Sequence, residues 1–243
     1  MNQGNDAGDR IILALDVSEQ DYALELVDNF ASYIDIFKVG LELFSSAGPL
    51  VIKAIHDRGK RVFLDLKFHD IPNTVSRAAV AAARMGVFMF NVHASGGLDM
   101  MKSCCDSVVD VCLKENLSRP RILAVTVLTS ISKDMLRDEI GIQHSLNTHV
   151  RHLSALALKA GLDGVVASGR EAAMIRGHCG RGFVIVTPGI RPSWTPPDDQ
   201  MRTMTPKEAI RQGADYIVMG RSIINQGDPL KTIERVRREI AAA

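Results

Sequence analysis

The stretch Arg61-Val-Phe-Leu-Asp-Leu-Lys67 decides the fold. Its apolar, partly β-branched core is typical of a strand that is covered on both faces. At its end, charged residues alternate with apolar ones. Seven further short apolar runs lie on either side of it, at residues 11–17, 35–40, 88–94, 122–129, 164–168, 183–190 and 216–223. Every gap between consecutive runs has room for a helix. The chain therefore repeats a strand-then-helix unit.

The gaps carry helix signals. Behind Ser18, a candidate N-cap, apolar residues recur every three or four positions: Ala23, Leu26, Val27, Phe30 and Ile34. Residues 205–208, Thr-Pro-Lys-Glu, combine a cap, a proline at the first helical position and a glutamate three residues after the cap. Asp228 followed by Pro229 predicts the start of a last helix.

Eight such units without a break in composition predict a (β/α)8 barrel of one domain over residues 1–243. No GxGxxG motif follows the first run, which disfavours an open doubly wound dinucleotide-binding sheet. We expect residues 1–9 to form a flexible tail. Residues 192–204, rich in proline and polar side chains, follow the seventh run and are a candidate active-site lid.

Composition excludes several classes of partner. With 29 Lys and Arg against 28 Asp and Glu, the net charge is +1, so no broad basic field predicts nucleic-acid binding. No apolar run approaches the length of a membrane span, and the polar first ten residues do not resemble a signal peptide. We therefore expect a cytoplasmic protein. Its four cysteines match no metal-binding spacing and are expected to be reduced: Cys104, Cys105, Cys112 and Cys179.

Charged residues at the carboxyl ends of the runs indicate the site, because active sites of such barrels lie at that end. Asp65 and Lys67 are two residues apart on one strand, so their side chains point the same way, roughly 6–7 Å apart along it. Lys38 is on the neighbouring strand and Asp70 is in the following loop. The four charges can converge, and the carboxylates then favour a protonated Lys67 that acts as an acid. The alternative is a salt-bridge network that merely pairs these charges.

Residues 63–74, Phe-Leu-Asp-Leu-Lys-Phe-His-Asp-Ile-Pro-Asn-Thr, resemble the signature of the orotidine 5′-phosphate decarboxylase family. The Asp-x-Lys-x-x-Asp core is shared with sugar-phosphate decarboxylases and synthases of the same superfamily, but Lys38 and the Asp-Ile-Pro-Asn-Thr segment make the resemblance more specific. Further segments resemble the family in the same order along nearly the whole chain, at residues 13–16, 37–40, 124–130, 187–191 and 218–221.

The resemblance implies decarboxylation of orotidine 5′-monophosphate to UMP and CO2, the last step of UMP synthesis, with no cofactor and no metal. It implies that Lys67 is the general acid that protonates C6 of the pyrimidine. Asp65 is expected near the substrate carboxylate, and Lys38 and Asp70 complete the charged array.

The resemblance also implies a set of binding residues. Asp16 and Lys38 are expected to hold the ribose hydroxyls, and Thr129 to contact the base. The 5′-phosphate is expected to bind Arg191, Gln200, Arg221 and the backbone of Gly220. In this family the residues that match Asp70 and Thr74 reach into the partner's site, so the resemblance implies a homodimer.

Two rival functions remain at this point. One is a superfamily relative that acts on a linear sugar phosphate through a metal-stabilised enediolate; an acidic residue at the end of the second run would favour it, but Lys38 is there. The other is a non-catalytic barrel that senses a nucleotide phosphate. His93 is a packing residue or a substrate contact, and residues 95–97, Ser-Gly-Gly, are a plain loop or an anion contact. His149 and His152 share a helical face without a third metal ligand.

Overall fold

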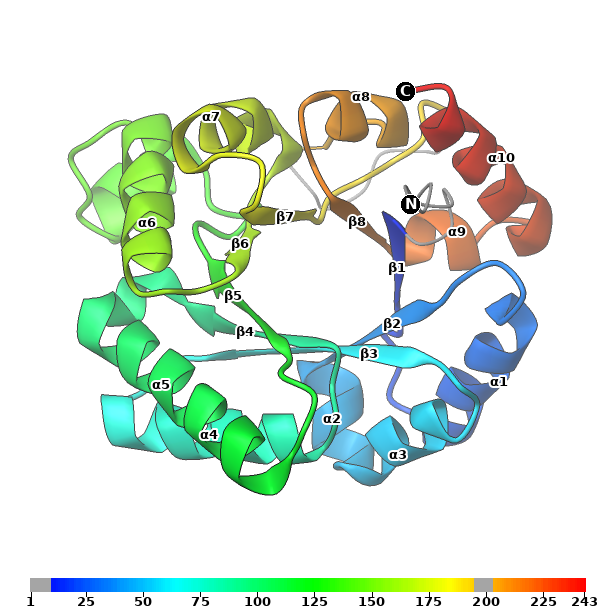
Figure 1. The fold of residues 1–243 in the computed structure, drawn as a ribbon. Helices are drawn as coiled ribbons and strands as arrows, with labels where there is room; N and C mark the ends of the chain where they lie inside the picture. The colour runs from blue at the N-terminus through cyan, green and yellow to red at the C-terminus, as the bar shows by residue number, and fades with distance from the viewer. Residues whose placement is uncertain (1–9, 195–202) are drawn as a thin grey trace.

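The computed structural model describes residues 10–194 and 203–243. In this part of the chain, eight parallel strands form a closed barrel in which each strand pairs with the next and β8 pairs with β1 (Figure 1). The predicted (β/α)8 barrel is confirmed. The strands are β1 (Ile11–Ala14), β2 (Ile36–Gly40), β3 (Arg61–Phe68), β4 (Met89–His93), β5 (Arg121–Val125), β6 (Gly164–Val166), β7 (Val184–Thr187) and β8 (Tyr216–Met219).

Helices surround the barrel on the outside, and the connection between each pair of strands contains at least one of them (Figure 1). The described α-helices are α1 (Gln20–Phe30), α2 (Leu41–Ala47), α3 (Leu50–His56), α4 (Pro72–Arg84), α5 (Gly97–Glu115), α6 (Leu146–Lys159), α7 (Gly169–Cys179), α8 (Pro206–Arg211), α9 (Arg221–Ile224) and α10 (Pro229–Ala241). Two short helical turns, η2 (Ala94–Gly96) and η3 (Met135–Glu139), complete the connections.

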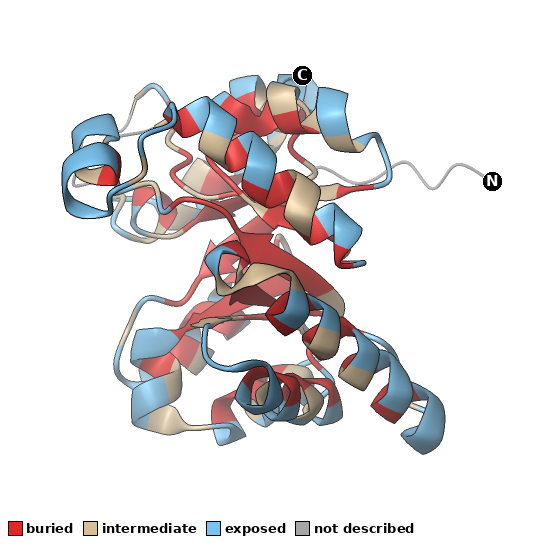
Figure 2. Cartoon of the chain, turned by 90° about the vertical axis from the view of Figure 1, so that its left-hand side faces the viewer, coloured by how far each residue is buried: buried red, intermediate tan, exposed pale blue. Residues whose placement is uncertain are grey.

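The core has two layers because alternate residues of each strand face opposite sides. Met89 of β4 belongs to the cluster inside the barrel, whereas Phe90 and Val92 pack in the larger cluster between the barrel and its helices. Burial therefore follows the barrel wall and the inner faces of the helices, while the outer helix faces are exposed (Figure 2). Strands covered on both sides explain the near-continuous apolar runs in the sequence.

Two of the predicted helix starts are confirmed and one is wrong. Thr205 forms a capping box with Glu208, and Asp228 caps α10 by accepting from the backbone N–H of Lys231. Ser18 does not cap α1, whose N-cap is Glu19. The Ser18 hydroxyl instead donates to a carboxylate oxygen of Glu42, 2.7 Å away, because the helix begins one residue later than the pattern indicated.

The predicted strands run too far at most of their carboxyl ends. The fifth run was expected to reach residue 129 and the eighth residue 223, but β5 ends at Val125 and β8 at Met219. Apolar residues continue past the hydrogen-bonded ladder for other reasons. Val127 lines a cavity at the barrel mouth, and Ile223 is buried in α9. Hydrophobicity alone therefore did not mark where the strands stop.

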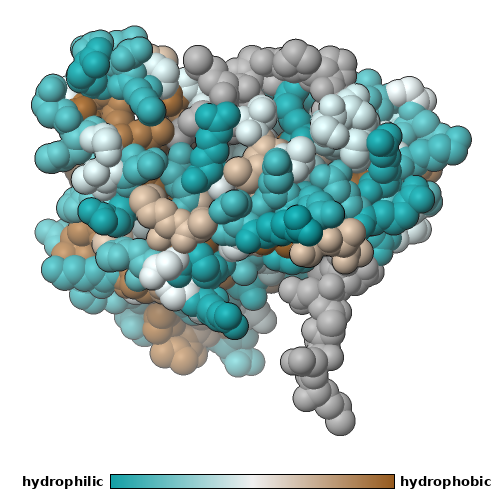
Figure 3. Space-filling view, turned by 90° about the horizontal axis from the view of Figure 1, so that it is seen from above, coloured by the Kyte–Doolittle hydropathy of each residue, from teal (hydrophilic) through white to brown (hydrophobic). Residues whose placement is uncertain are grey.

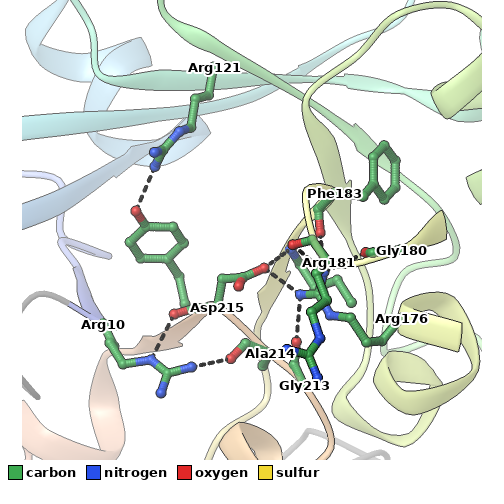
Figure 4. Close-up of polar contacts among 11 residues, drawn as sticks. Arg10, Arg121, Arg176, Gly180, Arg181, Phe183, Gly213, Ala214 and Asp215 are labelled. Carbon is green, nitrogen blue, oxygen red and sulfur yellow. Dashed lines mark hydrogen bonds and ion pairs between the residues drawn. The ribbon is translucent and has the colours of Figure 1, made fainter. Parts of the chain in front are cut away.

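The amino end of the barrel is held by arginines (Figure 4). The Arg121 side chain donates to the Tyr216 hydroxyl at 2.6 Å, and Arg176 pairs with Asp215, also at 2.6 Å. Arg10 donates to two backbone carbonyls just before β8. These guanidinium groups are engaged by the chain itself at the start of β1, β5 and β8. Their arrangement ties the strand ends together, opposite to the end that carries the predicted site.

The outer surface is largely hydrophilic on the face over α7, α8 and α10, where hydrophobic residues appear in separate patches (Figure 3). No helix in residues 10–194 and 203–243 is both long enough and apolar enough to cross a membrane.

Candidate active site

A cavity of about 270 Å³ opens at the carboxyl ends of the strands. Its floor is apolar, with residues such as Ala14, Phe63 and Val218 from inside the barrel. Its rim carries most of the predicted site residues, contributed by the ends of β1, β2, β3, β5, β7 and β8 or by the loops that follow them: Asp16, Lys38, Asp65, Lys67, Thr129, Arg191, Gly220 and Arg221. An apolar cavity with a few convergent polar groups is the usual form of a small-molecule site.

Four charges form an alternating row along one side of the cavity. Lys38 Nζ lies 2.8 Å from Asp16 Oδ1 and 3.5 Å from Asp65 Oδ2. The other oxygen of Asp65, Oδ1, lies 2.8 Å from Lys67 Nζ. The side chains of Lys38 and Asp65 are only 11% and 13% exposed, so the middle of the row is shielded from water. Asp16 and Lys67, at the two ends of the row, are more open to the cavity at 48% and 27%.

Lys38 stays cationic in this row. Burial lowers the pKa of Lys38, but the carboxylates of Asp65 and Asp16 outweigh burial, and the pKa is raised above its ordinary value. Gly40 leaves room for this arrangement, since a Cβ at that position would lie 2.9 Å from Lys38 Nζ. Lys38 therefore provides a fixed positive charge between two carboxylates.

Lys67 has an unusual backbone. Its φ is +51°, in the left-handed region that non-glycine residues rarely adopt, and this costs on the order of 1–3 kcal/mol. The register between β3 and β4 shifts at the same place. Leu64 is opposite Phe90, whereas Phe68, four residues later, is opposite Val92, only two residues later. The bulge turns the end of β3 and directs Lys67 Nζ back to Asp65. Such strain clusters at functional sites.

Asn91 is the main site residue that the sequence analysis missed. It is fully buried in β4, and its side chain bonds both to the backbone N–H of Lys67 and to the carboxylate of Asp65. A signal was available. Asn91 is a polar residue at an inward-facing position, next to the strand that carries Asp65 and Lys67, where apolar residues are otherwise the rule.

The structure does not bring Asp70 into the row within one chain. Asp70 is exposed, does not line the cavity, and accepts a hydrogen bond from the backbone N–H of Ile71 at 2.6 Å. Thr74, in the first turn of α4, is also exposed. The expected convergence of four charges is therefore wrong for a single chain, because the loop after β3 leads away from the cavity into α4. Three of the four meet, and Asp16 joins them.

Arg191, Gly220 and Arg221 also line the cavity, after β7 and β8, and Gly220 lies beside the Asp16 end of the charged row. Gly220 packs closely on β1, since a Cβ there would lie 3.1 Å from that of Ala14. The backbone N–H of Arg191 donates to the carbonyl of Met204, so these two residues lie next to each other. The loops after the seventh and eighth strands are where (β/α)8 barrels commonly bind phosphate. Gln200 and most of the predicted lid, residues 195–202, lie outside the described residues.

His93 lies at the end of β4, as predicted, but does not line the cavity. Its ring pairs with that of His69, with centroids 5.3 Å apart. Burial lowers the pKa of His93 below its ordinary value, and the neighbouring His69 and Lys67 lower it further. Residues 95–97 form the end of η2 and the start of α5, also away from the cavity.

The described residues contain no group of three or more His, Cys, Asp or Glu side chains placed to hold a metal ion. The cysteines are free thiols. Burial raises the pKa of Cys104 to about 12, so this thiol is not a nucleophile at neutral pH.

The closed barrel and the charged cavity at the carboxyl ends of its strands define the class: a (β/α)8 barrel with a candidate active site at the end where the active sites of such enzymes lie. Residues 9–236 match the model of the Orotidine 5'-phosphate decarboxylase / HUMPS family, and the chain belongs to that family.

Individual relatives agree over nearly the full length. The chain is 49% identical over 234 residues to the orotidine 5'-phosphate decarboxylase of Moorella thermoacetica, covering 96% of this chain and 93% of the relative. It is 48% identical over 238 residues to that of Syntrophotalea carbinolica, covering 98% and 97%. A crystal structure of orotidine 5'-phosphate decarboxylase from Lactobacillus acidophilus is similar, with a TM-score of 0.83 and 37% identity, over 96% of this chain and 99% of the other.

Proposed function

We propose that this chain decarboxylates orotidine 5′-monophosphate to UMP and CO2, the last step of UMP synthesis, and that Lys67 protonates C6. The observation that carries the proposal is the row of Asp16, Lys38, Asp65 and Lys67, shielded from water at its centre, at the mouth of a barrel of this family. Near-full-length relatives that carry the decarboxylase name support the choice of reaction.

The chemistry requires a cation beside C6. When the bond between C6 and the carboxylate breaks, the electron pair stays on C6 in an sp² orbital that the ring π system does not delocalise. A nearby ammonium stabilises this charge, and does so much more strongly in a shielded site than in bulk water. The pair on C6 then takes a proton from Lys67 Nζ, CO2 leaves, and the neutral amine regains a proton from solvent. Atoms and charges balance without an external electron acceptor.

Asp65 has two roles in this proposal. Its Oδ1 holds Lys67 Nζ at 2.8 Å, and the carboxylate places negative charge beside the position of the substrate carboxylate. As CO2 leaves, the negative charge of the substrate carboxylate moves to C6, next to Lys67, so its repulsion with Asp65 is relieved as the reaction proceeds. Lys38 Nζ lies 3.5 Å from the other carboxylate oxygen of Asp65, Oδ2.

The other residues of the cavity suit a nucleoside monophosphate. Arg191, Arg221 and the backbone of Gly220 bind the 5′-phosphate, Asp16 and Lys38 bind the ribose, and Thr129 contacts the base. Binding energy from the phosphate, remote from C6, then orients the reacting group against Lys67. We propose the same phosphate role for Gln200, which lies outside the described residues.

We further propose a cytoplasmic homodimer of single-domain subunits. Asp70 and Thr74 are exposed and lie outside their own chain's cavity, which suits residues that reach into a partner's site. In the dimer, Asp70 of one subunit completes the charged row of the other beside Lys67.

Decarboxylation is expected to continue at an unchanged rate in EDTA. The reason is that Lys67, and not a metal ion, stabilises the charge on C6 in the proposed mechanism. The assay follows the loss of pyrimidine absorbance with orotidine 5′-monophosphate in EDTA, and so tests the choice of substrate and the independence from metal together. A parallel reaction with a ketose phosphate and Mg²⁺ tests the rival enediolate chemistry, which Lys38 at the end of β2 disfavours. Turnover only of the sugar phosphate, or binding of UMP without any turnover of orotidine 5′-monophosphate, would contradict the proposed function.

A further inference from the structure

Asn91 is a buried polar side chain inside the barrel, and both ends of its amide are used. It is 0% exposed and lies two residues after Met89, on the same side of β4, and Met89 belongs to the apolar interior cluster. Its Nδ2 donates to Asp65 Oδ1 at 2.7 Å, and its Oδ1 accepts from the backbone N–H of Lys67 at 2.8 Å. One side chain on β4 therefore contacts the two residues of β3 at the centre of the proposed chemistry.

The bond to Lys67 replaces a missing strand contact. Residues 65–67 fall within the register shift between β3 and β4, where the ladder is interrupted. A buried backbone N–H without a partner is strongly disfavoured, so the left-handed conformation of Lys67 needs an acceptor at this point. The Asn91 carbonyl provides it.

The bond to Asp65 fixes the carboxylate. Asp65 Oδ1 accepts from both Asn91 Nδ2 and Lys67 Nζ, at 2.7 and 2.8 Å, while Oδ2 faces Lys38. The amide has only one orientation that satisfies both neighbours, because the N–H can only donate and the ionised carboxylate can only accept. An apolar side chain at this position could make neither bond.

We propose that Asn91 is a positioning residue for the decarboxylation. Its amide sets the backbone of Lys67 and the carboxylate of Asp65 at the same time, and so places Lys67 Nζ against C6 of the substrate. Asn91 does not line the cavity, so it acts through these two residues. The inference rests on the proposed function and adds to it a residue beyond the charged row.

Two variants separate the two bonds. Asn91→Ala removes both bonds, and kcat is expected to fall about 30- to 300-fold. The KM for orotidine 5′-monophosphate is expected to change less than about threefold, because a misplaced catalytic group slows the reaction more than it weakens substrate binding. Asn91→Asp has the same shape and keeps the acceptor for Lys67, but replaces the donor that faces Asp65. Ser154→Ala is the matched control: it removes another fully buried hydrogen bond, from the Ser154 hydroxyl to Val150, far from the cavity in α6.

The pH profile of Asn91→Asp distinguishes positioning from a structural role. Below its pKa the new carboxyl carries a proton and can donate to Asp65 as the amide does. Above it, two carboxylates face each other and displace Asp65. The ratio of variant to wild-type kcat is therefore expected to fall by about tenfold or more between pH 5 and pH 9. A structural role lowers the melting temperature but leaves this ratio independent of pH.

Each outcome decides the inference. If both variants fold and their kcat stays within about threefold of wild type, or if only KM changes, Asn91 has no positioning role. Failure of both variants to fold would also contradict it, by making Asn91 a purely structural residue; if only Asn91→Ala fails to fold, the pH profile of Asn91→Asp decides. Wild-type protein that does not decarboxylate orotidine 5′-monophosphate in the same assay overturns the proposed function instead.

Discussion

Lys67→Ala is expected to abolish decarboxylation while leaving the binding of UMP in place. In the proposed mechanism, Lys67 supplies both the charge that stabilises the electron pair on C6 and the proton that ends the reaction. Loss of a positioned acid and of a preorganised electrostatic contact together predicts a fall in kcat of at least about 10⁴-fold. The proposed phosphate, ribose and base contacts come from residues on or after other strands, so UMP affinity is expected to change by less than about tenfold.

The measurement compares turnover by absorbance with UMP binding by calorimetry. Lys102→Ala is a matched control, because Lys102 also has a carboxylate partner at 2.8 Å, Asp106, but on the exposed side of α5. The control is expected to keep wild-type values for both quantities. Near-normal turnover of the Lys67 variant would refute its role as the acid, and loss of UMP binding would indicate that the variant has lost the site as a whole.

Two inactive variants are expected to restore activity when they are mixed. If Asp70 acts in the partner's site, Asp70→Ala and Lys67→Ala are each inactive as homodimers. In a mixed dimer, one site combines an intact Lys67 from one subunit with an intact Asp70 from the other. Random exchange of subunits makes half of the dimers mixed, so about a quarter of the wild-type activity is expected to return. The physical basis is the exposed position of Asp70 outside its own cavity.

The control for this experiment uses two residues of the same cavity. Asp65 and Lys67 are in contact within one chain, so mixing Asp65→Ala with Lys67→Ala gives dimers in which neither site is intact. That mixture is expected to remain inactive at every ratio. If the Asp70 and Lys67 variants also fail to restore activity after subunit exchange, the shared site is wrong. Recovery in the Asp65 mixture would mean that the two residues do not act in the same site.

Much of the fold follows from the sequence because parallel strands covered on both faces leave a simple pattern. Apolar runs such as residues 61–67 and 88–94 mark the strands, and the gaps leave room for one helix layer. The row formed by Lys38, Asp65 and Lys67 was also predictable. A spacing of two on one strand, with a lysine on the neighbouring strand, indicates that the charges meet at the carboxyl end of a barrel, although the contact between Lys67 and Asp65 is made across a bulge and not along a regular strand.

What the sequence did not reveal depends on local backbone geometry and on chain assembly. The left-handed backbone of Lys67 has no propensity signal, because lysine does not favour that conformation and the surrounding packing imposes it. Asn91 was missed because a single polar residue does not interrupt the apolar pattern that predicts the short strand 89–93. The position of Asp70 depends on the path of the loop into α4, which side-chain spacing along β3 does not determine.

Exchange of the hydrogen at C6 of UMP in D2O tests the central claim most directly. A catalyst that delivers a proton to C6 also accelerates its removal, so wild-type protein is expected to replace this hydrogen with deuterium, followed by the loss of the C6 proton signal in NMR. Lys67→Ala, saturated with UMP, is expected to show no exchange above the rate without protein. Exchange by Lys67→Ala at the wild-type rate would show that another group carries the proton.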